Sequence, residues 1–310
     1  MSDVPTLPLH LTRTLVLERS LPGGHAHASA ASGLVLVGDT FVVALDDEHH
    51  IGVFPRTTTA PGRMVRVLPG DLPAPHAERK RRKPDLETIV RIDGERPGDA
   101  DMVVALGSGS TAERARAVML TVERGHLAEA PPAVLALADI YRPLGAAVPD
   151  MNIEAGVVMD GNLVLVSRAN GSVRHNTVIR FPIDAVRHWL VGRGEPPPPS
   201  SMERLDLGTV NEVPLGVTDA TVHPDGGWLV SAAAEDTTDS YADGRVVGAA
   251  LIWLSAALAP VARWRLSPTV KVEGIHAARQ GAQIRVWMVT DADDPDVAAG
   301  LYEAVLPAVR

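Results

Sequence analysis

Short segments with alternating apolar side chains recur along the whole chain. Gly, Asp or Asn bounds most of them, and they are rich in β-branched residues, which is the pattern of β-strands. The clearest examples read LVLVGD, TFVVALDD, MVVALGS, NLVLVSR, WLVSAAA and IRVWMVT. Long amphipathic helices are absent: residues 184–191 have the pattern of a short helical turn, and residues 113–117 are ambiguous. The chain is therefore predicted to be all-β.

A three-residue phrase begins one strand in each of five successive repeats. The central residues of these phrases are 55, 67, 64 and 55 residues apart, and they are Ser32, Glu87, Glu154, Thr218 and Glu273. Further strand patterns follow each phrase, and four antiparallel strands repeated around an axis form a β-propeller blade. We therefore predict one domain over residues 1–310, a five-bladed propeller whose four-stranded blades start near residues 31, 85, 152, 216 and 271.

The fifth repeat is too short for a complete blade. Only 37 residues follow Glu273, and the repeat offers three strand patterns. The missing strand is expected at the N-terminus, where residues 11–19 read LTRTLVLER. Pairing of this strand with the last blade would close the ring and leave few exposed sheet edges, so we expect a monomer.

Composition excludes several classes of function. The formal charge of −9 argues against a nucleic-acid partner. No apolar run approaches the roughly 18 residues that span a membrane, and the N-terminus has no signal-peptide pattern, so a cytoplasmic location is expected. The absence of cysteine excludes disulfides, thiolate metal sites and cysteine nucleophiles.

The phrase centres are predicted to form one ring, because the first strand of a propeller blade lines the central channel. Three converging carboxylates repel one another unless they share a cation. Oxygen ligands without His or Cys suit a hard ion, Ca²⁺ before Mg²⁺. The predicted ligands are Ser32, Glu87, Glu154, Thr218 and Glu273. The alternative is a water-filled channel with partly protonated glutamates.

The ends of the second strands should surround the same channel mouth, because the first two strands of a blade are antiparallel. These ends place Asp46, Asp47, Ser108, Ser110, Arg168, Asn170, Glu235 and Asp291 there. The basic run Glu78–Lys83 leads into the second phrase and is either a solvated loop or a basic rim of this mouth. The stretch Gly107–Ser110 is either an anion-binding loop or a flexible turn. We expect the mouth to bind phosphate or another small anion.

These features resemble the calcium-activated nucleotidase (apyrase) family, five-bladed propellers with a central calcium ion. The likeness lies in the order of the phrase centres, in FVVALDDEHHIGVF, and in the segment from GVTDATVHP to VKVEGIHA. The resemblance implies that the phrase centres surround calcium, and it places on the substrate face Asp46, Asp47, Arg168, Glu235 and Arg245. A looser resemblance to phytase-like propellers also points to phosphate esters.

Two classes of function are compatible with these patterns. The first is a calcium-dependent hydrolase of phosphate esters or nucleoside polyphosphates, with Asp47 as proton acceptor and Arg168 offsetting the developing charge. Its predicted substrate-binding residues are Asp46, Lys83, Ser108, Ser110, Asn170, Glu235 and Arg245. The second is a non-catalytic propeller that binds a ligand or a protein loop around a structural ion. Propellers host many functions, so the fold does not choose between the two.

Overall fold

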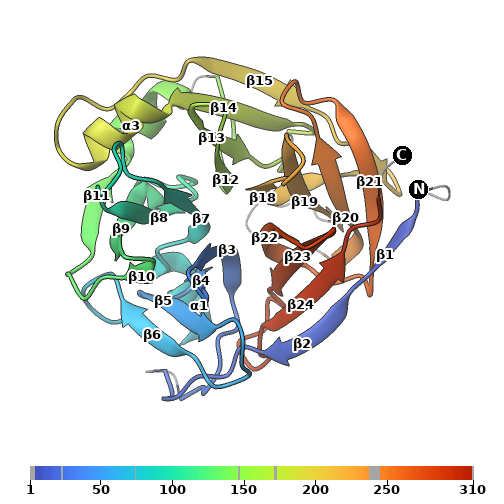
Figure 1. Ribbon diagram of the computed structural model, residues 1–310, viewed down its shortest axis with the longest axis horizontal. Helices are drawn as coiled ribbons and strands as arrows, with labels where there is room; N and C mark the ends of the chain where they lie inside the picture. Colours follow the sequence, from blue (N-terminus) through green and yellow to red (C-terminus); the bar gives the residue numbers. More distant parts are fainter. Residues whose placement is uncertain are drawn as a thin grey trace.

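The computed structural model contains five antiparallel blades arranged around one axis (Figure 1). It describes residues 4–21, 24–73, 75–145, 147–170, 173–236 and 245–308. The first strand of each blade lies nearest the axis, and the later strands follow outward. The prediction of an all-β, five-bladed propeller is confirmed.

The first three blades are built from consecutive strands. Blade 1 contains β3 (Ala31–Val37), β4 (Thr40–Leu45), β5 (His50–Pro55) and β6 (Arg63–Arg66). Blade 2 contains β7 (Leu86–Ile92), β8 (Asp101–Gly107) and β9 (Arg116–Glu123), with β10 (His126–Leu127) and β11 (Ala133–Ala136) both paired to β9. Blade 3 contains β12 (Ile153–Met159), β13 (Asn162–Ser167), β14 (Asn176–Pro182) and β15 (Ser201–Leu205).

The last two blades include the N-terminal segment. Blade 4 contains β18 (Gly216–Val222), β19 (Trp228–Asp236), β20 (Arg245–Leu254) and β21 (Pro260–Ser267). Blade 5 contains β22 (Val272–Gln280), β23 (Gln283–Thr290) and β24 (Gly300–Val305). The strand β2 (His10–Thr14) pairs antiparallel with β24 and completes blade 5 as predicted, although it is shorter than residues 11–19. The strand β1 (Thr6–Pro8) runs parallel to β21, an addition to blade 4 that the strand pattern did not predict.

The remaining elements are short. They are α1 (His76–Arg82), η1 (Ala112–Arg114), α2 (Ala138–Tyr141), η2 (Arg142–Leu144), α3 (Ile183–Leu190) and the hairpin of β16 (Thr209–Val210) and β17 (Val213–Pro214). The helix α3 confirms the helical turn predicted near residues 184–191. For the basic run Glu78–Lys83, the sequence predicts either a solvated loop or a rim of the mouth. Most of this run lies in α1, so the loop alternative is wrong. In the described part of the chain, no helix has the length and apolar character needed to cross a membrane.

One apolar cluster fills each interface between neighbouring blades. Phe41 of blade 1, for example, packs with Trp287 of blade 5, and Leu165 of blade 3 shares a cluster with Leu106 of blade 2. The alternating strand pattern explains this arrangement, because the two faces of a blade each contact one neighbour. Burial of these faces therefore stabilises the ring as a whole.

A β-bulge interrupts the first strand of every blade at the same place. The pairing register shifts between Ala31 and Gly33 in blade 1, and the other four first strands show the same shift. A bulge leaves one residue without a partner and re-aims its side chain. The five unpaired residues are the phrase centres Ser32, Glu87, Glu154, Thr218 and Glu273. Their structural equivalence, predicted from spacing, is confirmed.

Glycines let the first strands approach closely just past the bulges. A Cβ on Gly274 would lie 2.8 Å from the carbonyl carbon of Gly33, and a Cβ on Gly33 would lie 3.0 Å from the nitrogen of Ile89. A side chain at Gly274 would force its neighbours to move, and one at Gly33 would be in unusually tight contact with the backbone of the next blade. The first strands of blades 5, 1 and 2 therefore pack backbone against backbone beside the ring of phrase centres.

Truncation of Leu7 tests the contribution of β1. Leu7 is 1% exposed, whereas Leu11 in β2 is 54% exposed. We expect Leu7→Ala to lower the free energy of unfolding by about 2–5 kcal/mol, because it leaves a cavity in the core between blades 4 and 5. Leu11→Ala is the matched control and should change stability little. Equal effects of the two substitutions in denaturant unfolding would contradict a stabilising role for β1.

Acid stability tests the environment of His276, a half-buried residue of β22 whose ring stacks near Trp287. Burial, with a smaller effect of the Arg91 charge, lowers the pKa of His276 from 6.5 to about 4. Because the folded-state pKa lies below the unfolded one, the stability from neutral His276 is present above pH 6.5 and lost as the pH falls towards 4. We expect the free energy of unfolding of His276→Phe to fall less than that of the wild type between pH 6.5 and 4. Parallel curves of unfolding free energy against pH for the two proteins would contradict this expectation. His10→Phe, at an exposed position, is the control and should follow the wild type.

Candidate functional site

One mouth of the ring opens into a cavity of about 1000 Å³. Its walls come from the bulge regions of the first strands, the ends of the second strands, α1, and the loops before blades 3 and 4. The two layers predicted from the sequence therefore face the same space. Of the described residues that line it, thirteen are acidic and seven are basic. Acidic side chains therefore outnumber basic ones around this mouth.

The cavity gathers most of the residues predicted for the site. Those that line it are Ser32, Asp46, Asp47, Lys83, Glu87, Ser110, Glu154, Arg168, Asn170, Glu235 and Glu273. Thr218 and Ser108 are not among the lining residues. The Thr218 hydroxyl donates to the carbonyl oxygen of Val272 at 2.6 Å, and the Ser108 hydroxyl donates to Asp85. Arg245 begins β20, but its side chain lies outside the described residues.

Each glutamate of the ring has a cation supplied by the chain itself. Glu87 Oε1 lies 3.6 Å from Lys83 Nζ, and Glu273 Oε1 lies 3.3 Å from Lys271 Nζ. Glu154 Oε1 lies 3.7 Å from a terminal nitrogen of Arg168.

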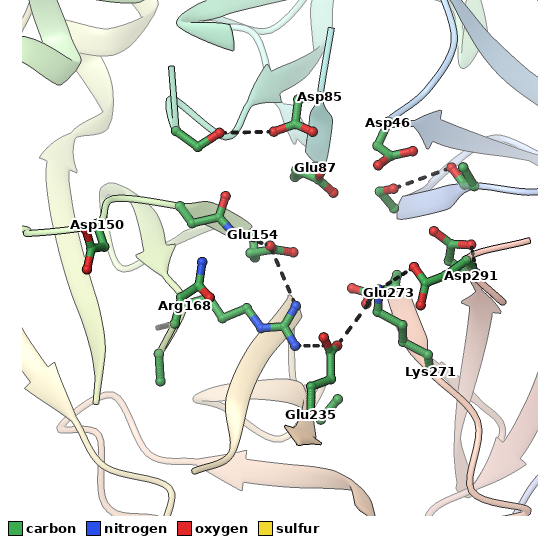
Figure 2. A pocket seen from close by; sticks show the side chains of 18 of the residues that line it. Asp46, Asp85, Glu87, Asp150, Glu154, Arg168, Glu235, Lys271, Glu273 and Asp291 are labelled. Carbon is green, nitrogen blue, oxygen red and sulfur yellow. Dashed lines mark hydrogen bonds and ion pairs between the residues drawn. The ribbon is translucent and has the colours of Figure 1, made fainter. Parts of the chain in front are cut away.

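Glu235 joins two of these pairs into one network. It accepts a hydrogen bond of 2.5 Å from Arg168 and lies 3.9 Å from Lys271 Nζ (Figure 2). The network therefore runs from Glu154 to Glu273 across blades 3, 4 and 5.

Burial dominates the electrostatics of the ring. It raises the pKa of Glu154, where the Arg168 charge opposes it, and it raises the pKa of Glu273 well above the usual value against the Lys271 charge. At Glu87, burial and the nearby charge of Asp85 both raise the pKa. Burial therefore favours the neutral form of these carboxyl groups, and the neighbouring Lys and Arg charges favour the ionised form.

Two further carboxyl groups on the cavity wall are strongly perturbed. Burial, with the charges of Asp46 and Glu48, raises the pKa of Asp47 to about 7. Burial raises the pKa of Asp291 to about 8. Because Asp47 is partly exposed and lines the cavity, it is placed to exchange a proton with a bound molecule or water.

A compact group of carboxylates lies on the side of blades 1 and 2. One oxygen from each of Asp46, Asp85 and Glu87 lies within 4.8 Å of the other two, and we call this group the acidic cage. Figure 2 shows these three side chains around the same part of the cavity. Asp46 Oδ1 is buried and accepts no hydrogen bond. Among the described residues, this is the one group of three with the geometry to hold a metal ion.

Asp85 is held in place by backbone and side chains together. Its φ of 58° is in the left-handed region, which Asp tolerates better than most residues. Its amide donates to the carbonyl oxygen of Asp46 at 2.9 Å, and its carboxylate lies 3.0 Å from Arg114 and 2.8 Å from Lys83. Strained backbone conformations held by several contacts cluster at functional sites.

The helix α1 is fixed to the mouth by charged side chains. Arg79 donates to Glu48 and lies 3.7 Å from Asp47, while Arg114 donates to the carbonyl oxygen of Lys80 at 3.1 Å. Lys83, directly after the helix, inserts its ammonium group among the three cage carboxylates. This inward set of ion pairs explains why the basic run forms an ordered helix without an apolar face.

The sequence carried a signal for some residues that the site prediction missed. Asp85, Asn152 and Lys271 each stand two positions before a phrase centre, and side chains two apart on a strand point the same way. Asn152 donates to Glu154 at 2.5 Å, and Lys271 pairs with Glu273. Arg114 had no comparable signal, because it reaches the cage from η1 in the loop between β8 and β9.

The fold and the site define a five-bladed propeller with an acid-rich cavity and a carboxylate cage at one mouth. The chain belongs to a family of unknown function, DUF6910, whose model matches residues 79–295. The family match is not to the calcium-activated nucleotidases, so that resemblance is supported only as far as the five-bladed fold. A search of curated proteins found no significant match.

Solved structures with similar folds share little sequence with this chain. A putative glycoside hydrolase from Parabacteroides distasonis has a TM-score of 0.50 at 10% identity, covering 95% of this chain and 93% of its own. A luciferin-regenerating enzyme has a TM-score of 0.47 at 12% identity, covering 92% and 94%. At these identities the likeness describes the fold alone.

Proposed function

We propose that this protein is a divalent-cation-dependent hydrolase of small phosphate esters, with the cation held in the acidic cage. The observation that carries the proposal is the convergence of Asp46, Asp85 and Glu87 oxygens within 4.8 Å at the wall of a large cavity. Asp46 Oδ1 is buried and accepts no hydrogen bond, which costs free energy. A cation bound to this oxygen would remove that cost. An all-oxygen donor set suits Ca²⁺, and Mg²⁺ less well.

The charge of the mouth supports a cation as the first ligand. With thirteen acidic and seven basic lining residues, a free phosphate group would meet net repulsion. Lys83 and Arg114 contact the cage at Asp85, and Lys80 of α1 lines the same cavity. An anionic group bound between the cage and α1 would have a cation on one side and these side chains on the other. This polarity favours a phosphate ester over a neutral substrate.

The chain's own residues then have distinct roles. Asp47 stands next to the cage and would accept the proton of the attacking water. Arg114 keeps Asp85 oriented, and Ser110, which accepts a hydrogen bond of 2.9 Å from Arg114, lies beside the proposed anion position. Arg168 is engaged by Glu154 and Glu235, so we assign it the positioning of the ring instead of direct charge stabilisation. When bound, the ion would polarise the phosphoryl oxygens.

Calcium binding can be tested without knowing the substrate. An ion that binds the folded protein and not the unfolded chain stabilises the fold. Ca²⁺ at a hundredfold excess over its dissociation constant should therefore raise the free energy of unfolding by about 2.7 kcal/mol. Asp46→Asn should abolish this response. Asp39→Asn removes the same charge from an exposed ion pair with Arg56 and is the matched control.

The outcomes of this titration are distinct. Equal melting midpoints in chelator and in millimolar Ca²⁺ and Mg²⁺ would contradict the cation site. A response lost in Glu154→Gln but kept in Asp46→Asn would place the ion in the ring predicted from the sequence.

Hydrolysis needs a separate assay. We expect phosphate release from one or more members of a panel of sugar phosphates, inositol phosphates and nucleotides, in Ca²⁺ but not in chelator. Asp47→Asn should lower kcat by about 10²–10⁴-fold with calcium binding intact, which is the usual contribution of a general base. A panel with no turnover, together with intact calcium binding, would instead favour the non-catalytic propeller.

A further inference from the structure

All three lysines of the chain line the cavity. They are Lys80, Lys83 and Lys271, whereas most of the basic residues are arginines. Lys83 is the most enclosed by carboxylates of the cage: its Nζ contacts Asp46, lies 2.8 Å from Asp85 and lies 3.6 Å from Glu87. Its side chain is 14% exposed. These are the same three residues that form the acidic cage.

An ammonium group and a metal ion cannot occupy this cage together. A calcium ion needs its oxygen ligands at about 2.3–2.6 Å, and the Lys83 ammonium already lies against all three carboxylates. Two cations at that separation would also repel each other. The cage can therefore hold either the Lys83 ammonium or a divalent ion, but not both.

We infer that Lys83 and a divalent ion are alternative occupants of the acidic cage, and that ion entry releases the Lys83 ammonium into the cavity, where it binds the anionic group of the substrate. The inference rests on the proposed function for the identity of the ion and of the anion. It makes Lys83 a substrate-binding residue only in the ion-bound protein.

The surroundings of Lys83 suit such an exchange. Lysine carries its charge on a flexible four-carbon stem, so the ammonium can move while the backbone stays in place. Lys83 is the residue directly after α1, and the helix itself remains tied to the mouth by Arg79. Arg114 stays 3.0 Å from Asp85 and keeps that carboxylate oriented after the lysine leaves.

Lys271 offers an internal contrast. It lies among Glu235, Glu273 and Asp293, at 3.9, 3.3 and 2.8 Å, and its side chain is 11% exposed. These acids are not a group with metal-binding geometry, whereas the cage is, within the residues that the structure describes. An entering ion should therefore displace Lys83 and leave Lys271 in its contacts.

The exchange also predicts coupling between the two ligands. Without the ion, Lys83 is sequestered by carboxylates and cannot meet an anion. With the ion bound, both the ion and the freed ammonium attract the anion. Ion and anion should therefore bind with positive cooperativity, each raising the affinity of the other by the same factor.

Acylation of the lysines in the wild-type protein tests the exchange directly. The probe is acetic anhydride at limiting concentration, with and without saturating Ca²⁺, and peptide mass spectrometry gives the rate at each lysine. We expect Ca²⁺ to raise the acylation rate of Lys83 by roughly tenfold or more, within the usual range of coupling. Lys271 is the internal control and should keep its rate. Calcium binding with an unchanged Lys83 rate would overturn the inference.

Two variants test the consequence for binding. Lys83→Met removes the competing ammonium, so its calcium affinity by calorimetry should rise by roughly tenfold. The same variant should lose most of the calcium-dependent affinity for methylphosphonate, a soluble probe of the anion position. Arg81→Met removes one charge from the exposed side of α1 and should show neither effect. A folded Lys83→Met variant with equal or weaker calcium affinity would overturn the exchange.

The failure of this inference and the failure of the proposed function give different results. If Lys83→Met does not fold, acylation of the wild type still decides. If Ca²⁺ raises the acylation rate of Lys83 but no substrate is hydrolysed, the hydrolase proposal is refuted and the inference stands. If substrates are hydrolysed but Ca²⁺ leaves the acylation rate of Lys83 unchanged, only the inference is refuted. A protein that binds neither Ca²⁺ nor Mg²⁺ refutes both.

Discussion

The β-bulge in the first strand of each blade is the constraint on which the mouth depends. It turns one unpaired side chain per blade towards the same end of the ring, and three of the five are glutamates. Close backbone packing at Gly33 and Gly274 holds the first strands of blades 5, 1 and 2 side by side. The fold thereby imposes a concentration of buried negative charge that the rest of the molecule must compensate.

The compensation comes from three places that are far apart in sequence. Lys83 follows a helix between blades 1 and 2, Arg168 follows the second strand of blade 3, and Lys271 precedes the bulge of blade 5. Removal of one member of a buried pair is costly, so these cations stabilise the mouth in its present form. Even so, two carboxylate oxygens that face the mouth, Asp46 Oδ1 and Glu273 Oε1, are buried and accept no hydrogen bond.

Stability and site chemistry are assigned to different parts of each blade. The apolar clusters fill the interfaces between blades. The N-terminal strands β1 and β2 add to the outer edges of blades 4 and 5. The charged groups lie at one end of the inner strands and in the loops that follow them. A substitution in the cavity can therefore change charge and binding without disturbing the apolar interfaces between the blades. This separation is compatible with the exchange proposed for Lys83.

The sequence determined what depends on local periodicity and repetition: the strands, the five repeats, the equivalence of Ser32 with the other phrase centres, and closure by the N-terminal segment. It could not determine contacts between distant segments. Thr218 donates to a carbonyl of the next blade, and Lys83 meets carboxylates of two blades. The helix α1 has no apolar periodicity and is ordered by ion pairs across the mouth. These features exist only after the ring has closed, because the partners are brought together by the packing of whole blades.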